Sequence, residues 1–296
     1  MKIKKILILC FVLYILHFVF LTSCYAFTKA KLLTIIYAEE EIGNFKQPQA
    51  IYLDEKRNKI YITDTLNHRL VSYHKKYYKF ISQFNAEGRL KLPLCMLRDK
   101  EGLLIVNNKG ENSVLIIDVK KKIIKPLALN DISPKPVPGN MKLDKEGYLY
   151  LIDKANKRIL VFSPKEYKFL KQIKTKDATG FSDIALTKKY LYALDPLKKE
   201  VFIYEKNSGK FVRSLSLKNL AFPLSLAIDA GGNLYVLDAH KCKVFVFDKN
   251  GNIISEIGRK GWKEGEFYYP RYVLLHKKQL YVVDTGNNRI QVFEIK

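Results

Sequence analysis

An internal repeat of about 45 residues runs through this chain of 296 residues and constrains its fold more than any other feature. One landmark is a proline, replaced once by phenylalanine, that precedes an apolar segment, at Pro48, Pro93, Pro138, Phe181, Pro223 and Pro270. A second landmark is an aspartate, replaced once by asparagine, that ends a short apolar segment, at Asp64, Asn107, Asp153, Asp195, Asp238 and Asp284. Successive landmarks of each kind are 42 to 47 residues apart, so the chain contains six units of one kind.

Each unit has the pattern of four short strands, which is clearest in the fifth unit. The strands predicted there cover Leu224–Asp229, Asn233–Asp238, Lys243–Asp248 and Ile253–Ile257. Alternating apolar residues, with Gly or Asn at the breaks, are typical of antiparallel hairpins. Four strands in roughly 40 to 45 residues is the period of a propeller blade. We therefore predict an all-β fold, a six-bladed β-propeller with four-stranded antiparallel blades.

The ring also needs a way to close. The chain ends at Lys296, just after the third predicted strand of the sixth unit. The apolar segment Leu32–Ala38, before the first proline, can supply the missing fourth strand. A strand donated from the N-terminal side would close the ring and remove an open sheet edge. We expect residues 31–296 to form one propeller domain.

Three units share the pattern D-x-x-N-x-R, at Asp64 to Arg69, Asp153 to Arg158 and Asp284 to Arg289. Together with the proline before the first strand, this pattern resembles the NHL repeat, whose family forms six-bladed β-propellers. The second and fourth units depart from it. We interpret the pattern as structural: the aspartate ends one strand, the asparagine takes a left-handed turn conformation, and the arginine pairs with the carboxylate.

The first 24 residues have the layout of an export signal, with three lysines, an apolar run Ile6–Phe20 and small residues before Cys24. The segment Leu21–Cys24 resembles a bacterial lipobox, which implies removal of residues 1–23 and a lipid on Cys24. An uncleaved membrane anchor is the alternative, because the apolar run is close to the length that spans a bilayer. Either alternative places a short tether, residues 24–30, and the propeller on the extracytoplasmic side of a membrane.

Basic residues outnumber acidic residues by 52 to 29, which gives a formal net charge of +23. Residues 1–23 contain three lysines and no acidic residue, so the rest of the chain keeps a charge of +20. Such a charge favours anionic partners. Outside the cytoplasm, these would be an anionic envelope polymer or a protein. Single-stranded RNA is a further alternative, since some animal NHL proteins bind it with their basic faces, but export argues against this partner.

In a propeller, the loops that enter each first strand lie on the same face as the turns between the second and third strands. Here these segments combine cations with aromatic side chains, which suits an anionic partner. The candidate binding residues are Arg69, Arg158, Lys199, Lys241, Arg259, Lys260, Trp262, Tyr268, Arg271 and Arg289. An ordinary solvated, lysine-rich surface is the alternative interpretation of these residues.

The mouth of the central channel is a second candidate region, formed where the first strands begin. Residues predicted there are Gln49, Asn140, Asp183 and Tyr272. Related lactonases and lyases gather calcium or zinc in the channel, so a metal-dependent enzyme is an alternative function. Only Asn140 and Asp183 are natural oxygen ligands for a hard cation, fewer than a calcium site needs, and no nucleophile motif is present. The sequence predicts no metal, no cofactor and no catalytic residue.

The function expected from these features is that of a non-catalytic, membrane-tethered and monomeric propeller. It would bind a protein partner or an anionic envelope polymer through its basic loop face. Cys95 and Cys242 are expected to be unpaired thiols, because one lies on a predicted inner strand and the other in a predicted turn, and no C-x-x-C pair is present.

Overall fold

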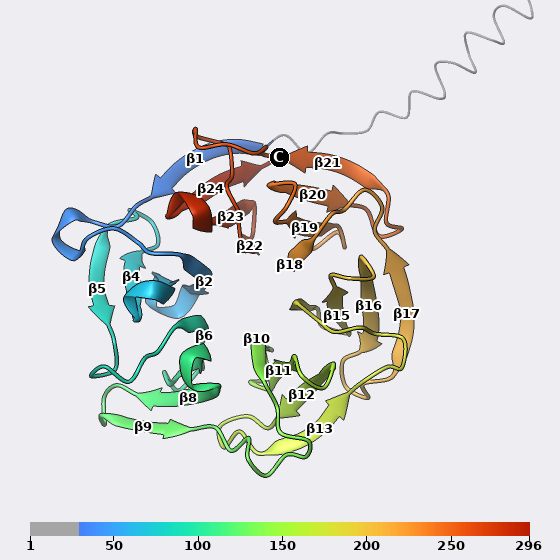
Figure 1. The fold of residues 1–296 in the computed structure, drawn as a ribbon, viewed down its shortest axis with the longest axis horizontal. Coiled ribbons are helices and arrows are strands. Elements are labelled where there is room, and N and C mark those ends of the chain that lie inside the picture. Colours follow the sequence, from blue (N-terminus) through green and yellow to red (C-terminus); the bar gives the residue numbers. More distant parts are fainter. Residues whose placement is uncertain (1–29) are drawn as a thin grey trace, which may run out of the picture.

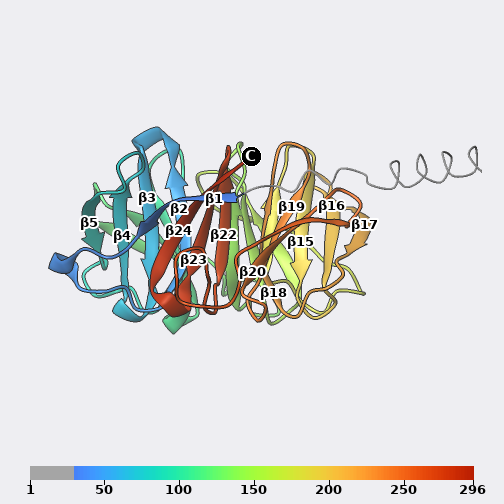
Figure 2. The same cartoon turned by 90° about the horizontal axis from the view of Figure 1, so that it is seen from above.

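The computed structural model describes residues 30–296, and the predicted export segment with Cys24 lies outside this range. Six four-stranded antiparallel sheets form a ring around a central axis (Figure 1). Seen from its edge, the ring is a disc whose strands run from one face to the other (Figure 2). The predicted all-β, six-bladed propeller is confirmed.

Each blade begins with its inner strand and proceeds outward along the chain. Blade 1 contains β2 (Pro48–Asp54), β3 (Lys59–Asp64), β4 (Arg69–His74) and β5 (Phe80–Phe84). Blade 2 contains β6 (Pro93–Arg98), β7 (Leu104–Asn108), β8 (Ser113–Asp118) and β9 (Ile123–Pro126). Blade 3 contains β10 (Pro138–Leu143), β11 (Leu149–Asp153), β12 (Arg158–Phe162) and β13 (Phe169–Ile173).

The other three blades repeat this arrangement. Blade 4 contains β14 (Asp183–Leu186), β15 (Tyr190–Asp195), β16 (Glu200–Glu205) and β17 (Phe211–Ser216). Blade 5 contains β18 (Pro223–Ile228), β19 (Leu234–Asp238), β20 (Lys243–Phe247) and β21 (Ile253–Ile257). Blade 6 contains β22 (Tyr272–His276), β23 (Gln279–Asp284), β24 (Arg289–Ile295) and the N-terminal β1 (Ala30–Ile36). The strands predicted for the fifth unit differ from those of blade 5 by at most one residue at each end.

Stacking of the blades explains where the core lies. Every residue of β11 and β12 is buried, whereas β17 is exposed at five of its six positions. The blades pack face to face, so both faces of their middle strands are covered by neighbouring blades. The outermost strand keeps one face in water. Apolar clusters accordingly fill the spaces between adjacent blades all around the ring.

The ring is closed by β1, as predicted, although this strand begins and ends two residues earlier than expected. It pairs antiparallel with β24, from Ala30 opposite Ile295 to Ile36 opposite Ile290. The partner strand sets these limits, because β24 extends to Ile295 and offers its backbone groups to the start of β1. The apolar pattern of residues 32–38 alone does not predict how β1 is aligned with β24.

Two details of the repeat interpretation are wrong. In blade 2, the residue equivalent to the landmark aspartate is Asn108 rather than Asn107, because Pro93 pairs with Asn108 as Pro48 pairs with Asp64. In the D-x-x-N-x-R turns, the left-handed conformation belongs to the residue after the asparagine. These residues are His68, Lys157 and Asn288, with φ between 51° and 54°.

Cys95 and Cys242 are both buried and unpaired, which confirms the prediction for the thiols. Among residues 30–296, no helix is long and apolar enough to cross a membrane.

Candidate functional site

The loops that enter the first strands and the turns between the second and third strands meet on one side of the disc, here called the entry-loop face. Backbone hydrogen bonds join the two sets: Leu66 N–H donates to the Lys46 carbonyl at 3.0 Å, Gly110 to Lys91 at 2.8 Å, and Gly286 to Tyr268 at 2.8 Å. The short helical turns of this face are turned toward the viewer in Figure 1. The predicted gathering of these segments on one face is therefore present.

Three arginines of the candidate binding set are not available to a ligand. Arg69, Arg158 and Arg289 are at most 8% exposed. Each donates from Nε to the aspartate five residues earlier, at 2.7 to 2.8 Å. Their remaining guanidinium donors contact backbone carbonyls of the entry loops. The arginines of the repeated turn therefore hold the loops and the blade together, so we exclude them from the binding surface.

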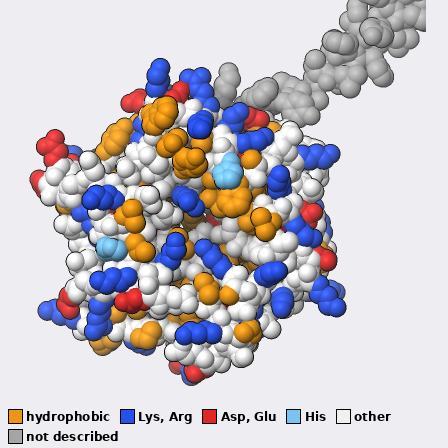
Figure 3. Space-filling model, viewed as in Figure 1, with side chains coloured by type: hydrophobic (Ala, Val, Ile, Leu, Met, Phe, Trp, Pro, Cys, Tyr) orange, Lys and Arg blue, Asp and Glu red, His pale blue; other side chains and the backbone are white. Residues whose placement is uncertain are grey.

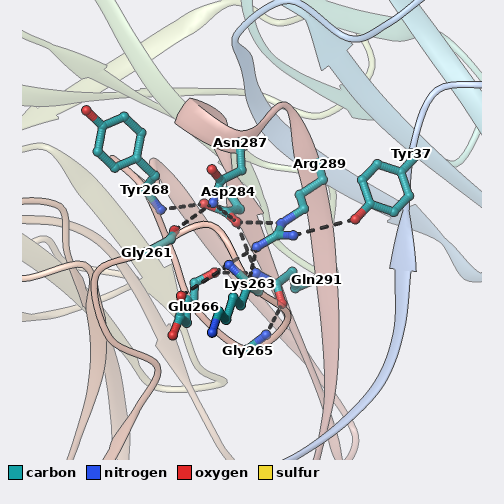
Figure 4. A network of polar contacts seen from close by, with 10 residues as sticks. All are labelled: Tyr37, Gly261, Lys263, Gly265, Glu266, Tyr268, Asp284, Asn287, Arg289 and Gln291. Carbon is teal, nitrogen blue, oxygen red and sulfur yellow. Dashed lines mark hydrogen bonds and ion pairs between the residues drawn. The ribbon is translucent and has the colours of Figure 1, made fainter.

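Figure 4 shows this network in blade 6. The Asp284 carboxylate accepts hydrogen bonds from the Tyr268 N–H at 2.7 Å, Asn287 Nδ2 at 2.8 Å and Gln291 Nε2 at 3.0 Å, besides Arg289. Arg289 Nη2 donates to the Lys263 carbonyl at 2.6 Å. Four donors around one buried carboxylate compensate its loss of hydration. The structural interpretation of the motif fits this geometry.

The other cations of the set remain at the surface. Lys241, Arg259, Lys260 and Arg271 are exposed, and Lys199 is half-buried. Arg259 is paired with Glu266 at 2.7 Å, and Lys241 donates to the Asn219 carbonyl. Lys and Arg side chains surround the central hollow of this face in Figure 3. The surface cations therefore form a broad ring rather than a single cluster.

Sequence reasoning overlooked Lys154, which lies at the channel mouth. It directly follows the landmark Asp153, the position that Lys109 occupies in blade 2 after Asn108. Burial and the charges of Lys109 and Arg271 lower the pKa of Lys154. In residues 30–296, no carboxylate lies within ion-pair distance of these three side chains. Comparing the residue that follows the landmark aspartate or asparagine across the six units would have identified Lys154.

The mouth itself is a cavity of about 280 Å³. Gln49, Asn140 and Tyr272 line it together with Lys154 and Arg271. Asp183, the fourth residue predicted at the mouth, is fully buried and does not line this cavity. The polar side chains at the mouth are thus two amides, three hydroxyls and two cations, set among apolar residues such as Leu94, Phe181 and Leu224. With two cations and no carboxylate among the described residues that line it, the mouth is an environment for an anion.

The buried Asp183 is satisfied by the protein. Its carboxylate accepts from Ser225 Oγ at 2.6 Å, the Leu226 N–H at 3.1 Å and the Ile184 N–H at 2.9 Å. Asn140 donates to the Ser182 carbonyl at 2.9 Å. Within residues 30–296, no group of three or more His, Cys, Asp or Glu side chains is placed to hold a metal ion.

Aromatic residues form a further part of the entry-loop face, beside blades 5 and 6. Trp262 is 69% exposed, and its ring lies 5.4 Å from that of Tyr268, which in turn lies 4.7 Å from Tyr269. A small cavity of about 270 Å³ beside them is lined by His240, Cys242, Lys260 and Tyr269. Exposed rings next to cations can contact both the apolar and the charged parts of a ligand.

Comparisons with known proteins agree on the fold. A family model described as a 6-bladed beta-propeller matches residues 223–296. A search of curated protein sequences finds no match to the chain. Among solved structures, a catalytically inactive virginiamycin B lyase from Staphylococcus aureus with quinupristin has a TM-score of 0.66 at 14% identity, covering 90% of this chain and 100% of the lyase.

Two further solved structures have the same architecture. A streptogramin B lyase has a TM-score of 0.64 at 13% identity, covering 93% of this chain and 100% of the lyase. A gluconolactonase from Xanthomonas campestris has a TM-score of 0.66 at 10% identity, covering 91% of this chain and 97% of the lactonase. At these identities the likeness shows the propeller fold alone, and the activities of these enzymes do not follow for this chain.

Proposed function

We propose that this protein is a non-catalytic propeller that binds an anionic envelope polymer, or an acidic segment of a protein, through its entry-loop face. The observation that carries the proposal is that Lys154 and Arg271 line the channel mouth, with the charge of Lys109 close to Lys154, and that none of these three cations is in an ion pair within residues 30–296. Like charges held together raise the free energy of the unbound protein. A chain of negative charges laid across the mouth would relieve this repulsion.

The aromatic residues beside blades 5 and 6 extend the surface outward from the mouth. Trp262 and Tyr269 present exposed rings, and Lys260 lines a small cavity together with Tyr269. An extended polymer can contact both the mouth and these rings. The proposal also retains the predicted N-terminal tether, which would hold the propeller near the envelope. Labelled palmitate on the wild type, but not on Cys24→Ala, tests the lipid.

Binding of labelled poly-glutamate and of a labelled glycerol-phosphate polymer, followed by fluorescence anisotropy, tests the function. Wild-type affinity should fall steeply with salt. The triple variant Lys109→Gln, Lys154→Gln, Arg271→Gln should bind about tenfold more weakly, since each exposed charge contributes roughly 0.5 kcal/mol. The matched control is Lys188→Gln, Lys277→Gln, Lys278→Gln, which removes three exposed lysines from the opposite face.

The control should keep wild-type affinity. Equal losses in the two triple variants would mean that only net charge matters, and the proposed surface would be abandoned. A preference for one of the two polymers would identify the chemical class of the partner.

The metal-dependent enzyme is not the function that the site supports best. The anionic oxygens of Asp183 already accept three hydrogen bonds from the protein. In residues 30–296, the side-chain oxygens that line the mouth belong to the amides of Gln49 and Asn140 and to the hydroxyls of Thr179, Ser182 and Tyr272, and none is a carboxylate, whereas hard cations favour carboxylates. A stoichiometric divalent ion that survives dialysis of the purified protein would reverse this ranking.

A further inference from the structure

A larger cavity, of about 660 Å³, opens on the face opposite the entry loops. Its rim is formed by the hairpins that join the first and second strands of blades 1 to 3, and Tyr272 and Leu274 complete it from blade 6. The size falls in the range of roughly 300 to 1,000 Å³ that is usual for small-molecule sites. Apolar side chains form much of its wall, namely Leu53, Leu97, Met141, Leu143 and Leu274.

Two polar side chains meet at the inner end of this cavity. Lys142 of β10 donates a hydrogen bond to the Tyr272 hydroxyl of β22, and its ammonium lies 4.7 Å from the centre of that ring. The Lys142 side chain is 21% exposed. The two residues line the cavity together, although they are 130 residues apart in the sequence.

Both groups keep hydrogen-bond donors that the protein does not use. The nearest carboxylate oxygen, Asp183 Oδ1, is 3.9 Å from the Lys142 ammonium, beyond hydrogen-bond length. An ammonium has three donors, and within residues 30–296 that of Lys142 makes one hydrogen bond, to Tyr272. The Tyr272 hydroxyl accepts this bond, and its own proton has no acceptor in residues 30–296. A site that offers only donors selects a ligand that accepts, above all a carboxylate.

The pKa values of Lys142 and Tyr272 keep both side chains protonated, so that both can donate hydrogen bonds. Burial pushes the pKa of Lys142 down, but the Asp183 carboxylate and Tyr272 push it up further, and the net direction is upward. Burial raises the pKa of Tyr272 to about 12. Around neutral pH, the cavity therefore ends in an ammonium and an un-ionised phenol.

Six acidic side chains line the cavity together with seven lysine and arginine side chains, and four of the six acidic side chains are in ion pairs, so they repel an entering anion only weakly. Asp54 lies 3.2 Å from Arg57, and Asp144 lies 3.0 Å from Lys206. The rim of the cavity is thus compatible with a negatively charged ligand.

We propose that this cavity binds a small amphipathic carboxylate. The carboxylate accepts hydrogen bonds from Lys142 Nζ and the Tyr272 hydroxyl, and the apolar body of the ligand packs against Leu97, Met141 and Leu274. The cavity opens on the face opposite the entry loops and shares Tyr272 with the cavity at the channel mouth. Its ligand does not depend on the function proposed for the entry-loop face.

Calorimetric titration of the full chain with 2-naphthoate, and with the neutral 2-naphthalenemethanol, tests the proposal. The wild type should bind the carboxylate at least tenfold more tightly than the alcohol. Lys142→Met should weaken 2-naphthoate binding at least tenfold, as expected for the loss of a hydrogen bond to a charged group. Tyr272→Phe should weaken it severalfold. Lys218→Met removes an exposed lysine of the loop between β17 and β18 and should leave binding unchanged.

Lys142→Met leaves the buried Asp183 without a nearby cation and can impair folding. Leu274→Trp is therefore a second variant, which fills the cavity from blade 6 without altering the ammonium, and it should abolish binding. Thermal melting shows whether each variant is folded. Affinity for 2-naphthoate should stay constant from pH 6 to pH 9, because the raised pKa values keep both groups protonated there.

Three results would overturn the proposal: no binding of 2-naphthoate to the wild type at millimolar concentration, equal binding of the alcohol, or wild-type affinity in folded Leu274→Trp. None of these results bears on polymer binding at the entry-loop face, which the lysine and arginine variants of that face test separately.

Discussion

The landmark aspartate of each repeat explains why the two sequence landmarks keep the same spacing. A backbone N–H one or two residues before the proline position donates to this side chain in all six blades, from Lys46, Lys91, Val137, Thr179, Ala221 and Tyr268. The hydrogen bond ties the entry loop to the end of the second strand. Since the two landmarks are joined physically, neither can shift along the chain without the other.

In the fourth blade, the landmark aspartate binds the entry loop without the help of an arginine. Asp195 accepts from the Thr179 hydroxyl at 2.6 Å, the Thr179 N–H at 2.6 Å and the Lys198 N–H at 3.1 Å. Hydroxyl and backbone donors thus replace the guanidinium. The departure of this repeat from the D-x-x-N-x-R pattern is compensated locally, and the blade keeps its fold.

At the scale of single residues, we predict that Arg289→Met destabilises the protein by about 3 kcal/mol. Removing one partner of a buried ion pair costs roughly 3 to 5 kcal/mol, and the three other donors to Asp284 favour the lower end. Urea unfolding measures the change. Lys198→Met, at the exposed turn of blade 4, is the control and should change the free energy of unfolding by less than about 0.5 kcal/mol. Similar values for the two variants would contradict the structural role of the motif.

At the scale of elements, the closing strand β1 shows two kinds of apolar residue. Ile36 is 2% exposed and packs in the core between blades 6 and 1, whereas Leu33 lies at the bulge in the ladder and is 43% exposed. The apolar pattern predicted a strand here, but the same pattern does not show which leucine or isoleucine is covered. Pairing with β24 decides this.

We predict that Ile36→Ala lowers the free energy of unfolding by about 2 to 5 kcal/mol, because a buried branched side chain is lost and a cavity remains. Leu33→Ala should cost less than about 1 kcal/mol, since little of that side chain is buried. Urea unfolding gives both values. Weakening β1 also uncovers the edge of β24, so light scattering should increase for Ile36→Ala on warming. Equal costs for the two substitutions would argue against the closure by β1.

At the scale of the whole molecule, the ring depends on the seam between blades 6 and 1. Thr285 donates to the Pro48 carbonyl at 2.6 Å, and Asn288 accepts from the Gln47 N–H at 2.9 Å. On the opposite face, His276 of blade 6 lies 2.8 Å from Glu55 and 3.4 Å from Lys75, both of blade 1. His276 is therefore a titratable group at this seam.

Burial lowers the pKa of His276, and the charges of Lys75 and Lys277 lower it further against the opposing effect of Glu55. The unfolded chain then binds a proton more readily than the folded ring does. We predict that this contribution to stability is lost as the pH falls from about 6.5 toward the lower pKa of the folded state. The difference in unfolding free energy between wild type and His276→Gln should change over this interval and be constant above pH 8. Parallel pH profiles would refute the assignment.

Much of this protein is determined by sequence alone. The sequence predicts the six units, the four strands in each unit, the landmark aspartate and the strand that closes the ring. These features follow from the alternation of apolar and polar residues, from turn chemistry and from repetition, which act over a few residues at a time. The motif already predicted that Arg69, Arg158 and Arg289 pair with their aspartates, and tertiary structure decided which other cations stay exposed at the channel mouth, namely Lys154 and Arg271. Tertiary structure also brought together Lys142, Asp183 and Tyr272 from three blades. Their meeting depends on the closure of the ring, and no local pattern encodes that distance.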